Sequence, residues 1–162
     1  MVTFICGLLM MLGLMLMLLA AVGFIQDKKM FTSAPKEVCE AILPKPERFK
    51  GQHFLGWVIM MIAFLCFIAA LLFGALDGIQ NGLSFVSMFL RFLIMMLMVK
   101  AFDICFFDWF LLCRSGFFPH YFPEVKPLLG PHLFGFNAKS HLLQILVFIP
   151  ASLALAGICM LF

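Results

Sequence analysis

Four charged side chains lie inside an apolar block that runs from Leu83 to Cys113. They are Arg91, Lys100, Asp103 and Asp108. A charge at membrane depth costs roughly 2.5 kcal/mol or more, so such residues usually face a protein interior or a water-filled cavity. The block therefore indicates a polar site enclosed by the fold.

These charges offer one candidate anchor for a ligand and one candidate ion pair. Arg91 is the deepest of them, and its planar guanidinium suits a carboxylate or a phosphate. It is expected either to pair with Asp77 or an outer-leaflet phosphate, or to anchor an anionic ligand. Lys100 and Asp103 are three residues apart and can pair along one helix surface. The candidate ligand-binding residues are therefore Arg91, Lys100, Asp103 and Asp77.

A second set of side chains is suited to acid–base chemistry. Histidine titrates near neutral pH, and a histidine beside a carboxylate can move protons or bind a metal. His120, His132 and His141 follow one another at spacings of twelve and nine residues, which match no compact metal-binding pattern. No metal site is therefore predicted, and no particular cofactor is indicated. The catalytic candidates are Asp108, His120, Glu124, His132 and His141.

The composition indicates the type of fold that positions these residues. Of the 162 residues, 65% are hydrophobic and only 12% are charged, whereas soluble domains are about a quarter charged. Four apolar runs reach the roughly 20 residues needed for a membrane span. The prediction is an all-α integral membrane protein, a four-transmembrane-helix bundle in one membrane domain, 1–162. Its helices are expected at about 2–25, 54–76, 83–113 and 142–162.

The segment between the third and fourth runs is unusual for a loop. Between Ser115 and Ser140, four prolines alternate with six aromatic residues. Water-exposed loops do not need so many aromatics, and irregular backbone at membrane depth must be buried in protein. The segment is therefore expected to be interfacial or re-entrant.

Basic residues predict the orientation. The loop 26–53 holds six Lys or Arg, and Arg114, Lys126 and Lys139 follow the third run, whereas both ends of the chain lack them. Such loops stay cytoplasmic, so both termini are expected on the non-cytoplasmic side of a bacterial inner membrane. The net charge of +3 is read as this signal and not as a nucleic-acid footprint.

Small residues predict how the helices pack. Ala63, Cys66, Ala70 and Gly74 recur along one face of the second run, and Ser152 and Ala156 do so in the fourth. Such spacing lets helix backbones approach closely in lipid, so an intramolecular seam is expected.

The basic loop is expected to contain a short helix. Ser33 would cap it, Pro35 would lie in its first turn, and Val38, Ala41 and Ile42 would share its apolar face. This helix is expected to lie on the cytoplasmic interface.

Two functions remain open at this stage. The first is a non-enzymatic accessory, transport, or lipid- or anion-binding module that works as a homo-oligomer or with a partner membrane subunit. The second is a membrane enzyme that acts on a lipid or isoprenoid-like substrate at the cytoplasmic interface.

Overall fold

The computed structural model describes residues 1–31, 34–43 and 45–162, and this part of the chain is helical, with no strand. Four of its helical segments are long and apolar enough to cross a membrane: Val2–Ile25, Gln52–Gln80, Phe85–Leu112 and Ala138–Cys159. The expected all-helical fold, with four helices long and apolar enough to span a membrane, is therefore confirmed.

The four spans are built as follows. The first joins α1 (Val2–Leu18) to a π-helix, Leu19–Ile25, and the second is α3 (Gln52–Gln80). The third joins α4 (Phe85–Phe102) to a longer π-helix, Asp103–Leu112, and the fourth is α6 (Ala138–Cys159).

Two of the predicted helix starts were too late by a few residues. α3 begins at Gln52 and α6 at Ala138, because polar residues at these ends are absorbed into helix. Gln52 is fully buried, and its amide donates to the backbone carbonyl of Phe24 at 2.9 Å. A polar residue that is satisfied by the protein can thus lie inside a helix, although hydropathy places it in the loop.

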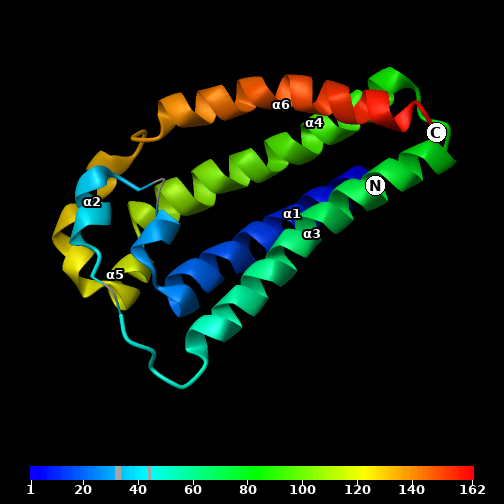
Figure 1. Ribbon diagram of the computed structural model, residues 1–162. Helices are drawn as coiled ribbons and strands as arrows, with labels where there is room; N and C mark the ends of the chain where they lie inside the picture. Colours follow the sequence, from blue (N-terminus) through cyan, green and yellow to red (C-terminus); the bar gives the residue numbers. More distant parts are fainter. Residues whose placement is uncertain (32–33, 44) are drawn as a thin grey trace.

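The spans converge at one end and separate at the other (Figure 1). Both termini and the short turn between α3 and α4 lie at the convergent end, whereas the two longer connecting segments, with their basic residues, lie at the open end. α1 packs against α3 and α4, whereas α6 packs mainly along α4. The core at the convergent end receives residues from all four spans: Cys6, Met10, Ala70, Met88, Phe92, Met95, Ala156 and Cys159.

The small-residue seam is present and intramolecular. Ala63, Ala70 and Gly74 of α3 are buried, as are Ser152 and Ala156 of α6. Cys66 departs from the pattern, since it is only half-buried. The absence of bulky side chains along these faces is what lets α3 approach α1 and α6 approach α4.

Gly13 marks a close backbone approach along the α1–α3 seam. A Cβ at this position would lie 2.9 Å from the Ala63 carbonyl oxygen, which is backbone and cannot move aside. We expect Gly13→Ala to destabilise the protein by about 1–3 kcal/mol through overpacking. The measurement is the free energy of unfolding of the purified wild type and of Gly13→Ala in detergent micelles.

Gly157 provides the matched control, because a Cβ there would meet nothing within 4 Å. Gly157→Ala also lies in a helix and should be neutral or slightly stabilising. Equal effects at the two glycines would contradict close packing at Gly13.

A second core closes the open end. Its buried members are Val22, Phe31, Val38, Ile42, Phe122 and Val125. The predicted loop helix is α2 (Lys36–Ala41), with Pro35 at its N-cap position, and its apolar residues Val38 and Ile42 pack into this core. Ser33, the predicted cap, lies outside the described residues.

The proline-aromatic segment folds into three short helical pieces. They are α5 (Phe117–Tyr121) and two 3₁₀ helices, Pro123–Leu128 and Pro131–Leu133. Phe122 and Val125 are buried in the second core, and Phe31 packs edge-on against Phe122 at 5.2 Å. The segment thereby covers the open ends of the spans (Figure 1).

Candidate functional site

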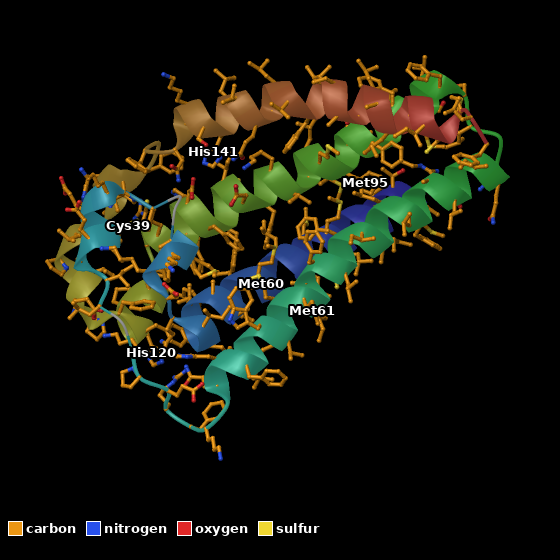
Figure 2. The ribbon with its side chains drawn as sticks, in the orientation of Figure 1. Cys39, Met60, Met61, Met95, His120 and His141 are labelled. Carbon is orange, nitrogen blue, oxygen red and sulfur yellow. The ribbon has the colours of Figure 1, made fainter. Side chains whose placement is uncertain are left out.

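A cluster of four ionisable side chains joins α6 to the end of the third span. Lys100 Nζ lies 2.6 Å from Asp103 Oδ2 and 3.3 Å from His141 Nδ1. The other imidazole nitrogen, Nε2, lies 2.5 Å from Asp108 Oδ2. In Figure 2, His141 lies between α6 and α4. Two of the catalytic candidates and two of the ligand-binding candidates therefore share one site.

The π-helix explains how both carboxylates reach this site. On an α-helix, residues five apart point about 140° away from each other. A π-helix bonds each residue to the one five positions away, so residues with that spacing lie on roughly the same side of the helix. The terminal bonds from Gln26 N to Ala21 O and from Ser115 N to Phe110 O show this spacing in the two π segments. Asp103 and Asp108 consequently share one face.

The contacts of His141 fit one tautomer of a neutral imidazole. An ammonium has only donors, so Lys100 donates to Nδ1, and Nε2 carries the proton that is donated to Asp108. With a neutral imidazole, one ammonium and two carboxylates, the cluster carries a net charge of −1. A cationic group would therefore complement the charge of the cluster.

A cavity of about 140 Å³ lies beside the cluster. Its wall is largely apolar and comes from both π segments, α2, α5 and the connecting 3₁₀ helices, with Val22, Phe31, Phe122 and Val125 among its residues. Among the residues that the structure describes, its polar lining residues are Asp103, Asp108 and Asn137. A cavity of about 150 Å³ in another protein accommodates benzene, so this one can take an apolar group of about that size.

Arg91 and Asp77 form a second polar site at the opposite end. Arg91 Nη1 lies 2.7 Å from Asp77 Oδ2 and donates to the Gly74 carbonyl at 2.7 Å. The expected contact between Asp77 and Arg91 is therefore present. It connects α3 to α4 near their shared turn, and Arg91 is mostly buried, with 11% of its side chain exposed.

The remaining candidates lie apart from the cluster. His120 is exposed and packs edge-on against Tyr121 at 4.9 Å, and His132 is also exposed. Figure 2 shows His120 far from His141. Glu124 binds Lys45 Nζ at 2.9 Å and accepts from the Leu43 N–H at 3.2 Å. These three residues do not join Asp108 and His141.

A third polar group was not anticipated from the residue pattern. Arg48 donates to Gln52 Oε1 and to the Gly23 carbonyl, while the Gln52 amide also contacts Gln26 Oε1 at 3.2 Å. Gln26 has a left-handed backbone, with φ of 53°, where the first π-helix ends. This network holds the cavity wall formed by the first span. In the sequence, the only sign of this polar group was a glutamine next to a long apolar run.

The contact between Glu124 and Lys45 predicts a pH dependence outside the membrane spans. Burial raises the pKa of Glu124, but hydrogen bonds from its own backbone, from Lys45 and from Leu43 outweigh burial, so the pKa lies below the ordinary 4.5. A lowered folded-state pKa makes the contact stabilising above about pH 4.5, and this stabilisation is lost as pH falls through the folded value. Once the contact is lost, we expect the backbone amide of Leu43 to exchange its hydrogen about fivefold faster, after the rate is divided by the intrinsic exchange rate at the same pH.

The control for this experiment is Glu124→Gln. Its Leu43 amide should already be less protected at pH 7, and the protection should not change further on acidification. A pH profile identical to that of the wild type would contradict the role of Glu124.

Comparison of the chain with protein-family models, curated proteins and solved structures finds no match. Within the described residues, no three His, Cys, Asp or Glu side chains are grouped closely enough to hold a metal ion. The cavity and its charged wall are therefore the features of this protein that point to a function.

Proposed function

We propose that this protein is a non-enzymatic membrane module that binds a lipid or isoprenoid-like molecule in the cavity at its basic end. The observation that carries the proposal is a largely apolar cavity with Asp103 and Asp108 in its wall. Ligand sites are typically apolar pockets with a few polar groups that set orientation. An accessory or transport role would use the same binding step.

Two further features support this proposal. The cavity is enclosed by the loop-side segments and not by the lipid-facing middle of the spans, so a ligand reaches it from the interface. Both π-helices contribute to its wall, and π segments inside α-helices are often located at functional sites.

The test is native mass spectrometry of the full chain purified with its lipids. We expect a retained small amphiphile in the wild type and its loss in Ala21→Phe, which fills the cavity. Ala154→Phe is the matched control, because Ala154 is exposed on α6. A spectrum without bound ligand in the wild type, or equal retention in both variants, would contradict the proposal.

We also propose that the module works as a homo-oligomer in a bacterial inner membrane with both termini non-cytoplasmic. The support for assembly is that α6 packs mainly along one helix, which leaves its outer face to lipid or to a second copy. The basic loop residues lie at the end opposite the termini, which supports the orientation. A single monomeric mass, or a cytoplasmic reporter signal from a fusion at Phe162, would contradict these points.

The alternative is a membrane enzyme acting on a similar molecule, and one observation favours it. Asp108 lines the cavity and is supported from behind by His141, so its carboxylate is placed to accept a substrate proton. In that case Asp108→Asn would abolish turnover, while variants at the exposed His120 and His132 would remain active. Full retention of any measured turnover in Asp108→Asn would exclude this role.

A further inference from the structure

Two carboxylates in the cavity wall, Asp103 and Asp108, present hydrogen-bond acceptors. We infer that the cavity takes a ligand whose polar group is a hydrogen-bond donor, an alcohol or an ammonium, attached to an apolar group of about benzene size. This inference rests on the proposed binding function and specifies its ligand class. It differs from the anionic ligand that Arg91 was expected to anchor.

The two carboxylates have unused acceptor capacity. Asp103 and Asp108 bind Lys100 and His141 through Oδ2, and within the described part of the chain no side-chain hydrogen bond to either Oδ1 is found. Both side chains are partly accessible, with 23% and 20% exposed. An ionised carboxylate can only accept hydrogen bonds, so the two Oδ1 atoms can be satisfied by O–H or N–H groups of a ligand.

The donors of the cluster do not line the cavity. Lys100 and His141 do not belong to its lining, and Lys100 Nζ is held by Asp103 and His141. An anionic group in the cavity would therefore meet two carboxylates without a matching donor from the cluster. The net charge of −1 adds repulsion for an anion and attraction for a cation.

The apolar wall limits the rest of the ligand. Phe31, Phe107, Phe118 and Phe122 contribute rings, and the volume of about 140 Å³ matches one six-carbon ring. A longer molecule would place only its end group inside.

The experiment compares three probes with the same ring: benzyl alcohol, benzylamine and benzoate at pH 7. Binding to the full chain in nanodiscs is measured by titration calorimetry, and the heat obtained with Ala21→Phe is subtracted to remove partitioning into lipid. We expect benzyl alcohol and protonated benzylamine to bind with at least tenfold lower Kd than benzoate, as for hydrogen bonds to charged groups.

A second comparison uses Asp108→Asn and Asp103→Asn, with folding checked by gel filtration. Loss of one negative charge should raise the Kd of benzylamine about tenfold, while that of benzyl alcohol changes less than about threefold, since an amide oxygen still accepts. If neither variant folds, the three-probe comparison in the wild type decides alone.

The outcomes separate the inference from the proposed function. Benzoate binding as tightly as the alcohol overturns the donor assignment and leaves the binding function intact. No saturable binding of any probe beyond that of Ala21→Phe overturns both.

Discussion

Lys100→Met is expected to destabilise the folded protein by about 3–5 kcal/mol, since removing one member of a buried charge cluster leaves its partners uncompensated. Lys100 is only 8% exposed, and it contacts both Asp103 and His141. Without its ammonium, two carboxylates remain in a poorly solvated site. Denaturant unfolding of the purified protein in mixed micelles measures the loss.

The control is Lys139→Met, an exposed lysine half a turn before His141, whose replacement should change stability by less than about 0.5 kcal/mol. The double variant Lys100→Met/Asp103→Asn restores the charge balance and should recover about half of the loss. A Lys100→Met protein as stable as the control would show that the cluster is hydrated and energetically minor.

Arg91→Met is expected to have the next largest effect, also about 3–5 kcal/mol. The substitution leaves Asp77 without its ion-pair partner and the Gly74 carbonyl without its side-chain donor. Asp77→Asn should cost less, about 1–3 kcal/mol, because an amide can still accept a hydrogen bond from the guanidinium. The free energy of unfolding of both variants, and of the double variant, gives the coupling between the two residues.

This cycle also tests the anion-binding hypothesis for Arg91. A structural pair predicts a favourable coupling of about 0.5–3 kcal/mol and no anion-dependent stabilisation. An anion anchor predicts instead that Asp77→Asn frees the guanidinium and that added phosphate stabilises this variant. Arg114→Met, at an exposed arginine, is the control for loss of positive charge alone.

The two polar sites differ in what they offer a ligand. Arg91 has its partners within the chain, from α3, and the Arg91–Asp77 pair lies where all four spans converge. The cluster around His141 borders a cavity, and its carboxylates keep acceptor capacity. Ligand chemistry is therefore expected at the basic end, while the pair at the other end is expected to hold α3 and α4 together.

The sequence by itself determined the class and the general plan of this protein. Four long apolar runs with few charges are expected to form helices in lipid, because a helix satisfies its own backbone hydrogen bonds there. The spacing of residues along the chain was also sufficient to predict the pairing of Lys100 with Asp103 and the buried small-residue seam of α3. These features depend on helical periodicity, which can be read directly along the chain.

Tertiary structure alone decided which polar residues meet. His141 is separated by 33 residues from Asp108, and its distance from His120 and His132 in space depends on how the proline-aromatic segment folds. An α-helical projection places Asp103 and Asp108 on different faces, and only the π-helix aligns them. Such a change in helical pitch is favoured by packing between spans and has no signature in residue spacing, so the charged cavity wall could be found only in the folded protein.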